Sequence, residues 1–245
     1  MKSSTDNSNK RKGILYGIGV GPGAPGLLTV SAADHIRSAD ILCLPQAPKE
    51  KCRAYQIALQ AVPEIRNKVV ICFEFPMTRD IAVLEHEHML IYQKIRDLLL
   101  GGKTVAFLTI GDPCIYSTFT YISDKASSED FPVRIISGVT SFLAAAGRLG
   151  ISLCRENEEL HVGTGSGDLE SLLALRGTKV IMKNGSSMGK VKAILRKAEQ
   201  ETNVLVYAVS DCGLKSEKIF QGADSLPEDK NYMTIIFVLE KPMVN

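Results

Sequence analysis

The chain has 245 residues, of which 45% are hydrophobic and 23% are charged, and its formal net charge is +2. This balance is typical of a globular protein and gives no reason to expect a nucleic acid or a membrane surface as a partner. No apolar run reaches the roughly 18–20 residues that a membrane-spanning helix needs. The length allows one large domain or two small ones.

Residues 1–12 are polar and lack the apolar stretch of a signal peptide, so we expect them to form a disordered tail. The six cysteines are scattered along the chain and form no CxxC pair. Reduced, structural cysteines are the simplest interpretation, and they favour a cytoplasmic protein.

The first half of the chain alternates short apolar runs with amphipathic segments. Strand-like runs occupy residues 13–20, 39–44, 67–75, 103–110 and 133–137. Helical patterns occupy residues 27–39, 50–62 and 80–99, and a further short helix is expected after residue 110. Such alternation predicts a parallel sheet that is covered by helices on both faces.

The second half of the chain ends differently. Strands are expected at 159–165, 178–183 and 203–210 with helices between them, and then at 217–222 and 232–240 with only short turns. Short turns join antiparallel strands, so this half predicts a second α/β domain with a mixed sheet. The expected fold is therefore two α/β domains, at 13–138 and 139–245, after the 1–12 tail.

The glycine-rich loop GVGPGAPG at 19–26 lies between an expected strand and an expected helix. It fits the GxGxxG pattern of dinucleotide-binding proteins. However, Pro22 and Pro25 have no N–H to offer to a pyrophosphate, and Pro45 stands where an acidic residue would follow the second strand. A proline-braced turn that packs against an uncharged part of a ligand, or only closes a tight corner, fits these residues better.

A second loop, GDPCIYST at 111–118, follows the apolar run at 103–110. Asp112 followed by Pro113 is the pattern of a helix N-cap. A carboxylate at the carboxyl end of a strand is equally well placed to accept hydrogen bonds from a ligand, so both interpretations stay open. A third turn, SGVTS at 137–141, leads into a helix of small residues that Thr140 or Ser141 would cap.

Two groups of polar residues have alternative interpretations. His86 and His88 are two residues apart on a helix and do not share a face, so we predict no metal site. Lys49, Lys51 and Arg53 follow the second expected strand. They are either solvated surface charges or a binding site for a polyanionic substrate.

Taken together, these motifs resemble the tetrapyrrole (corrin/porphyrin) methyltransferase family. YGIGVGPGAPGLLTVSAADHIRSAD at 16–40 is similar to the opening motif of the family, GDPCIYSTFTYI at 111–122 to its second motif, and SGVTS to its usual PGVSS. The YGIGVGPG opening and the YSTFTYI continuation resemble the branch that methylates the C-20 meso carbon of precorrin-2 or cobalt-factor II in cobalamin biosynthesis. The resemblance extends from about residue 13 to residue 241.

The resemblance implies an S-adenosylmethionine-dependent C-methyltransferase that binds its cofactor in the cleft between two domains and releases S-adenosylhomocysteine. It also implies a free tetrapyrrole as substrate, and a homodimer. Carried over by position, the cofactor-binding residues are Pro22, Ile110, Gly111, Asp112, Ile115, Thr140, Ser141, Met182, Ala208 and Thr234. The proton lost by the methylated carbon goes to water or to a polar group such as Tyr116, which makes Tyr116 a candidate catalytic residue, and no general base is assigned. Lys49, Lys51 and Arg53 are candidates for binding the carboxylates of the substrate.

Three positions depart from the family pattern. Ala24 replaces the acidic residue of GPGD, and Ser137 replaces a proline. Pro45 stands where relatives that methylate uroporphyrinogen have an aspartate, which argues against that substrate. The alternatives are a methyltransferase of the same superfamily, acting at another corrin position or like diphthine synthase on a protein histidine, an NAD-dependent oxidoreductase, and a binding or assembly subunit without turnover.

Overall fold

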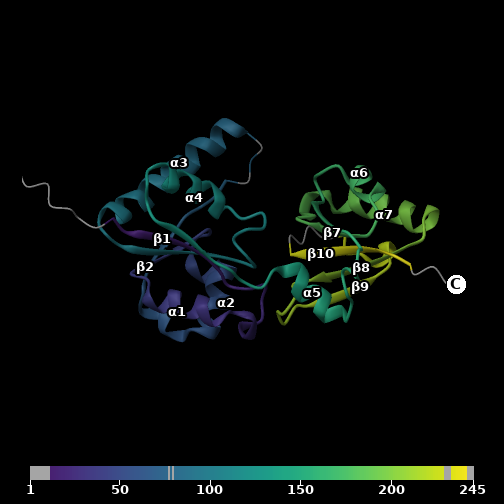
Figure 1. The fold of residues 1–245 in the computed structure, drawn as a ribbon, viewed down its shortest axis with the longest axis horizontal. Helices are drawn as coiled ribbons and strands as arrows, with labels where there is room; N and C mark the ends of the chain where they lie inside the picture. Colours follow the sequence, from purple (N-terminus) through teal and green to yellow (C-terminus); the bar gives the residue numbers. More distant parts are fainter. Residues whose placement is uncertain (1–11, 77, 79, 229–232, 242–245) are drawn as a thin grey trace, which may run out of the picture. The chain divides into compact units, whose positions relative to one another are not determined.

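The computed structural model describes residues 12–76, 78, 80–228 and 233–241. It divides into two compact units, Met1–Val139 and Thr140–Asn245, each built on one five-stranded sheet (Figure 1). The polar tail expected at residues 1–12 lies outside the described residues, apart from Lys12. Within the described ranges, no helix combines the length and the apolar character needed to cross a membrane.

The sheet of the first unit is parallel throughout, as the alternating pattern predicted. Its strands are β1 (Ile14–Gly19), β2 (Ile41–Leu44), β3 (Val69–Cys72), β4 (Thr104–Thr109) and β5 (Val133–Ile136). They lie in the order β3-β2-β4-β1-β5, so β1 is flanked by two strands that come much later in the chain. Parallel order places the carboxyl ends of all five strands at one edge of the sheet.

Two pairs of helices cover this sheet, one on each face (Figure 1). Helices α1 (Val30–Ser38) and α2 (Arg53–Ala61) pack on one face, and α3 (Ile81–Leu100) and α4 (Phe119–Ser128) on the other. Each pair buries an apolar stripe against alternate residues of the strands, which is why both faces of the strands are apolar. Three short 3₁₀ helices complete the unit: η1 (Pro25–Leu27), η2 (Lys49–Lys51) and η3 (Pro63–Asn67).

The helix expected directly after residue 110 begins later than Asp112 and Pro113 suggested. Helix α4 starts at Phe119, and Ser117 Oγ accepts the hydrogen bond from the backbone N–H of Phe119 at 3.1 Å. The N-cap interpretation of Asp112 was therefore wrong. The physical reason is that both carboxylate oxygens of Asp112 bind backbone amides of loops, as described below.

The sheet of the second unit is mixed, as predicted. Its strands are β6 (Leu160–Thr164), β7 (Thr178–Met182), β8 (Val204–Ser210), β9 (Lys218–Gln221) and β10 (Thr234–Glu240), in the order β6-β7-β10-β8-β9. Only β6 and β7 are parallel, and β10 pairs antiparallel with both β7 and β8. Helices α6 (Leu169–Ala174) and α7 (Met188–Glu201) pack on one face, and α5 (Ser141–Leu149) on the other. The short η4 (Gly185–Ser187) and η5 (Ala223–Ser225) lie in its connections.

Candidate functional site

Three loops leave the carboxyl edge of the first sheet side by side. Because β4, β1 and β5 are neighbours in the sheet, the loops that follow them, at 111–118, 20–29 and 137–139, begin next to one another. We call these segments the three-loop cluster. In open parallel sheets this edge is where ligands bind.

Glycines let the loops of the cluster pack backbone against backbone. A Cβ added to Gly138 would lie 2.2 Å from the carbonyl oxygen of Gly111, and one added to Gly19 would lie 2.5 Å from the same oxygen. No larger side chain fits at either position without moving the main chain. Gly111 itself has a φ of +71°, a conformation that favours glycine.

Asp112 joins two loops of the cluster through its carboxylate. Oδ1 accepts a hydrogen bond from the backbone N–H of Cys114 at 2.7 Å, and Oδ2 accepts one from the N–H of Gly138 at 2.9 Å. The residue is only 9% exposed. A buried carboxylate is costly unless it is hydrogen-bonded, and these two bonds meet that need. The geometry therefore gives Asp112 first of all the role of holding the 111–118 loop to the 137–139 turn.

The first loop is fixed to both of its neighbours. Gly21 and Gly111 exchange two backbone hydrogen bonds, of 3.3 and 2.8 Å. Thr29 Oγ1 accepts a hydrogen bond from the N–H of Ala32 at 3.1 Å and donates one to the carbonyl of Ser137 at 3.3 Å. Thr29 is thus the N-cap of α1 as well as a tie to the third loop. A threonine directly before an amphipathic run is the sequence pattern that could have identified this role.

These bonds argue against a phosphate-binding loop. In the dinucleotide-binding motif the glycine loop opens a helix whose free N-terminus faces the pyrophosphate. Here α1 starts only at Val30, and Thr29 already caps it. Two amides of the loop, at Leu27 and Leu28, donate to carbonyls of the same loop, and Pro22 and Pro25 have none. The GxGxxG match is therefore a match of the sequence pattern alone, and the geometry of the loop does not reproduce the dinucleotide-binding motif.

The remaining predicted site residues of the first unit also lie in or beside the cluster. Pro22 is buried, and Ile110 and Ile115 are half-buried. Tyr116 is 43% exposed and has a φ of +50°, which is uncommon for a residue with a side chain. A strained tyrosine on an otherwise tightly fixed loop is a candidate for contact with a ligand.

The predicted site residues of the second unit fall into two groups. Thr140, Ser141 and Met182 form the first group: Thr140 and Ser141 begin α5, and Met182 ends β7 and packs with the apolar cluster under α5. Thr140 is the N-cap of α5, yet its hydroxyl makes no capping bond. Its Oγ1 is buried and has no hydrogen-bond partner among the described residues. A buried hydroxyl without a partner is costly, so a polar ligand group at this atom fits the site.

Ala208 and Thr234, the second group, have no exposed surface. Ala208 lies in the middle of β8 among the apolar residues under α6 and α7. The Thr234 hydroxyl is hydrogen-bonded to Ser210 Oγ at 2.6 Å. Their side chains therefore shape the sheet, and neither side chain is accessible from outside this unit's core.

Asn184 is a polar residue of this sheet edge that the sequence pattern did not reveal. It is fully buried, and its Nδ2 donates to the carbonyls of Thr234 at 2.9 Å and Ile181 at 3.3 Å. It thereby ties the end of β7 to the start of β10. A single asparagine after an apolar run carries no distinctive sequence signal.

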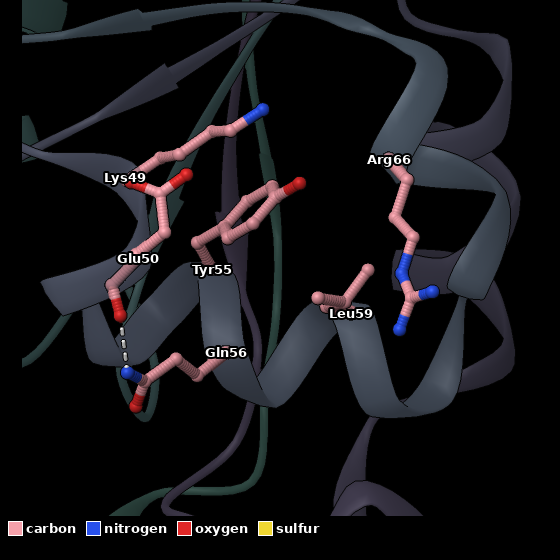
Figure 2. Close-up of a pocket in the computed structure, with 6 residues that line it drawn as sticks. All are labelled: Lys49, Glu50, Tyr55, Gln56, Leu59 and Arg66. Carbon is pink, nitrogen blue, oxygen red and sulfur yellow. Dashed lines mark hydrogen bonds between the residues drawn. The ribbon is translucent and has the colours of Figure 1, made fainter.

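The predicted basic residues separate in the structure. Lys49 lines a cavity of about 370 Å³ beside α2, together with Glu50, Tyr55, Gln56, Leu59 and Arg66 (Figure 2). Lys51, although on the same 3₁₀ helix, is exposed and does not line it, and neither does Arg53 at the start of α2. Of the three predicted residues, only Lys49 lines this cavity, and the substrate-binding role of the group stays a prediction.

The thiols of Cys43, Cys114 and Cys212 have a raised pKa, which disfavours their reactive thiolate form. Burial raises the pKa of Cys43 to about 12 and that of Cys212 to about 11. Burial and the hydrogen bond to Asp112 also raise the pKa of Cys114, which lies in the three-loop cluster. A thiol must ionise to act as a nucleophile or a metal ligand. Among the residues that the structure describes, no group of three or more His, Cys, Asp or Glu side chains is placed to bind a metal ion.

Comparison with known proteins defines the class to which this fold and site belong. The family model of the tetrapyrrole (corrin/porphyrin) methylases matches residues 14–224. The fold is similar to that of uroporphyrin-III C-methyltransferase from Thermus thermophilus in complex with S-adenosylhomocysteine, with a TM-score of 0.69 at 16% identity, over 93% of this chain and 98% of that one. The chain belongs to the tetrapyrrole methylase family and is a C-methyltransferase, as the sequence predicted.

Individual relatives point to one branch of this family. The chain is 30% identical to the probable cobalt-precorrin-2 C(20)-methyltransferase of Methanocaldococcus jannaschii, over 87% of this chain and 89% of the relative. It is 29% identical to the cobalt-precorrin-2 C(20)-methyltransferase of Salmonella typhimurium, over 89% and 92%. A uroporphyrinogen-III C-methyltransferase of Bacillus subtilis and a siroheme synthase of Psychrobacter cryohalolentis also match, so membership of the family does not by itself identify the substrate.

Proposed function

We propose that this enzyme methylates the C-20 meso carbon of precorrin-2 or cobalt-factor II in cobalamin biosynthesis. The support is the C(20) specificity in the names of both relatives above, together with the branch-specific YGIGVGPG and YSTFTYI motifs. The cofactor is S-adenosylmethionine, as predicted. When bound, this cofactor supplies an electrophilic methyl group on a positively charged sulfur.

The structural observation that supports the cofactor site within this proposal is the three-loop cluster. Its glycines bring main chain within contact of the position where a ligand binds in such sheets, and its first loop has no free helix N-terminus for a phosphate. A sulfonium cofactor has no phosphates, so it loses nothing by this arrangement. Carbonyl oxygens of the glycine loops and the Asp112 carboxylate provide a negative environment that tolerates the positive sulfur.

The proposed contribution of the protein is mainly to position the reactants. Positioning alone can contribute roughly 7–11 kcal/mol to lowering a barrier when reacting atoms are held close to contact. Pro22, Ile110, Gly111, Asp112 and Ile115 are the proposed cofactor contacts in the first unit. Thr140, Ser141 and Met182 are the proposed contacts in the second, with Thr140 Oγ1 as the hydrogen-bonding atom. Ala208 and Thr234 remain family-derived proposals that act through the backbone or through the packing of β8 and β10.

Tyr116 is proposed to relay the proton that leaves the methylated carbon: its phenol oxygen takes up this proton while its own hydroxyl proton passes to water. The Tyr116→Phe variant should then turn over more slowly while its affinity for S-adenosylhomocysteine stays unchanged. Single-turnover methyl transfer and calorimetry measure the two quantities. Unchanged turnover would remove Tyr116 from the mechanism, and water would be the acceptor.

The first test is calorimetric titration of one preparation with S-adenosylhomocysteine and then with NAD. Micromolar binding of the first ligand and none of the second is the expected result. Cobalt-factor II and precorrin-2 are then offered in separate methyl-transfer assays, with the position of the new methyl group read by NMR. Binding of NAD alone would contradict the proposal, and methylation at another corrin position would move the enzyme to a different branch.

The cytoplasmic location and the homodimer implied by the family resemblance remain predictions. The six unpaired cysteines favour a reducing compartment. Light scattering during size-exclusion chromatography would give the oligomeric state.

A further inference from the structure

The cavity beside α2 lies outside the three-loop cluster but next to it. Its six lining residues come from η2, α2 and η3, and α2 is in contact with η1 of the first loop of the cluster. Figure 2 shows the side chains of Lys49, Glu50, Tyr55 and Gln56 on one side of the opening and those of Leu59 and Arg66 on the other. The volume of about 370 Å³ is within the range of small-molecule sites.

The charges in this cavity are not balanced by the protein. Lys49 and Arg66 face a single lining carboxylate, Glu50, which leaves a net charge of +1. The acidic residue two positions before Arg66 is Glu64, and Glu64 is paired with Arg37 at 3.4 Å. Arg66 therefore has no ion-pair partner among the described residues. A guanidinium without a partner presents a planar fork that matches a carboxylate.

Among the residues that the structure describes, Lys49 makes no ion pair and instead contacts an aromatic ring. Its Nζ lies 5.7 Å from the centre of the Tyr55 ring, in cation–π contact. Gln56 Nε2 donates one of its two N–H groups to the carbonyl of Glu50. The two cations are the lining groups whose charge attracts an anion.

Two lining residues contribute apolar surface. Tyr55 is 4% exposed and offers its ring, with its hydroxyl at the opening (Figure 2), and the half-buried Leu59 offers its methyl groups. A ligand that satisfies both parts of the cavity has one negative group and a short apolar stem. The net charge of +1 matches a monoanion better than a phosphate dianion.

We propose that this cavity binds a carboxylate on a short aliphatic stem, with Arg66 as its main partner and Lys49 as the second cation. Two sources have this chemistry. One is a carboxylate-bearing side arm of the tetrapyrrole, which rests on the proposed function. The other is a free aliphatic carboxylic acid. The contact of α2 with η1 favours the side arm, because it brings the cavity next to the cluster.

The test uses sodium valerate as the probe and valeramide as its neutral equivalent. Binding of each to the full-length protein is measured by saturation-transfer NMR for the wild type and for Arg66→Gln and Lys49→Gln. Lys51→Gln is the matched control, because Lys51 is on the same 3₁₀ helix and outside the cavity. Cobalt-factor II affinity is measured on the same variants by absorbance, and melting temperatures report whether each variant is folded.

The expected result is that valerate binds and valeramide does not, with a loss of about tenfold in affinity for Arg66→Gln and no change for Lys51→Gln. If Arg66→Gln lowers the affinity for cobalt-factor II, with or without a lower affinity for valerate, the carboxylate belongs to a side arm of the tetrapyrrole. If it lowers only the affinity for valerate, the ligand is a free carboxylic acid. Equal binding of valerate and valeramide, or indifference of both anionic probes to Arg66, overturns the proposal.

Binding of S-adenosylhomocysteine separates this inference from the proposed function. It should be the same in all these variants, since none of the three residues lies in the three-loop cluster. A wild-type protein that bound neither S-adenosylhomocysteine nor cobalt-factor II would contradict the proposed function, while the valerate titration would still decide on the cavity.

Discussion

The loops of the three-loop cluster can pack against one another only if certain single residues are glycine, and Gly138 is the clearest example. A Cβ at this position would come within 2.2 Å of the Gly111 oxygen and 2.8 Å of the Gly19 carbonyl carbon. We expect Gly138→Ala to lower the free energy of unfolding by about 2–3 kcal/mol, as overpacking does, and to abolish S-adenosylhomocysteine binding. Denaturant titration and calorimetry measure the two effects.

Gly147→Ala is the matched control for this prediction. Gly147 is exposed in α5, and a Cβ there would meet no atom within 4 Å. Alanine should raise the free energy of unfolding by about 0.5–1 kcal/mol, because it restricts the unfolded chain and favours the helix. Equal effects of the two substitutions would contradict the role given to the glycine contacts.

Asp112 provides the second prediction at this scale. Asn in its place can keep one acceptor oxygen, but its amide then faces the N–H of Cys114 or of Gly138. We expect Asp112→Asn to lower the free energy of unfolding by about 1–3 kcal/mol and to weaken S-adenosylhomocysteine binding. Asp124→Asn, an exposed site on α4, should change neither quantity. A stable Asp112→Asn variant with normal affinity would show that the carboxylate is dispensable.

The residue scale also shows where the sequence was informative and where it was not. Gly19, Gly111 and Asp112 were identified from the sequence because glycine and aspartate directly after an apolar run are typical of loops at the carboxyl end of a strand. Tyr55 and Arg66 did not, because a tyrosine and an arginine in amphipathic segments are ordinary residues until the fold brings them to one cavity. The use of Asp112 as a bridge to Gly138 depends on a strand order that no local pattern encodes.

Among the elements, α5 packs on its sheet through apolar residues and also makes a partly buried ion pair through Arg148. Arg148 Nε donates to Glu217 Oε1 at 2.7 Å, and Glu217 Oε2 accepts from the N–H of Gly213 at 2.7 Å. Arg148 and then this amide hold the pKa of Glu217 below its ordinary value near 4.5. A lowered pKa means that the stabilisation is complete above the ordinary value and is lost as the pH falls through the lowered one.

We therefore expect Glu217→Gln to lower the free energy of unfolding at pH 7 by about 1–2 kcal/mol. The difference from the wild type should shrink below pH 4.5, where the wild-type carboxylate takes up its proton. Urea titrations at several pH values measure this. Glu201→Gln is the control, because its pair with Lys197 is exposed and such pairs contribute little. A difference that did not depend on pH would rule out the ion pair as its cause.

The elements were the most predictable level of the structure. The 80–99 periodicity corresponds to α3 at Ile81–Leu100, and the five runs of the second half correspond to β6 to β10. The hydrophobic periodicity and the composition of a segment depend only on its own residues, so helices and strands can be predicted from the sequence. The start of α4 was not predictable, because Asp112 has a tertiary partner that competes with the local capping pattern.

At the scale of the whole molecule, the proposed cofactor site predicts a ligand-dependent melting temperature. S-adenosylhomocysteine at about one hundred times its dissociation constant should stabilise the folded chain by about 2.7 kcal/mol. For a protein of this size that is a rise of roughly 5–10 °C. NAD at the same concentration should leave the melting temperature unchanged. Differential scanning calorimetry gives the comparison, and an equal rise with both ligands would contradict the site.

The strand order of the first sheet also determines when the protein can begin to work during its own synthesis. β1 is synthesised first but pairs with β4 and β5. Ile14 is paired with Thr104, and Leu15 with Val133, so β1 can enter the sheet only after these later residues have been synthesised. Such pairing over long sequence distances is slow, since the chain must close large loops before the contacts form. Until Gly138 has emerged from the ribosome, the nascent chain can form neither the hydrogen bond between Asp112 and Gly138 nor the close contacts of Gly138 with Gly111 and Gly19. The three-loop cluster therefore forms only after the first unit has been completed, and the proposed cofactor site predicts that chains truncated before Gly138 do not bind S-adenosylhomocysteine.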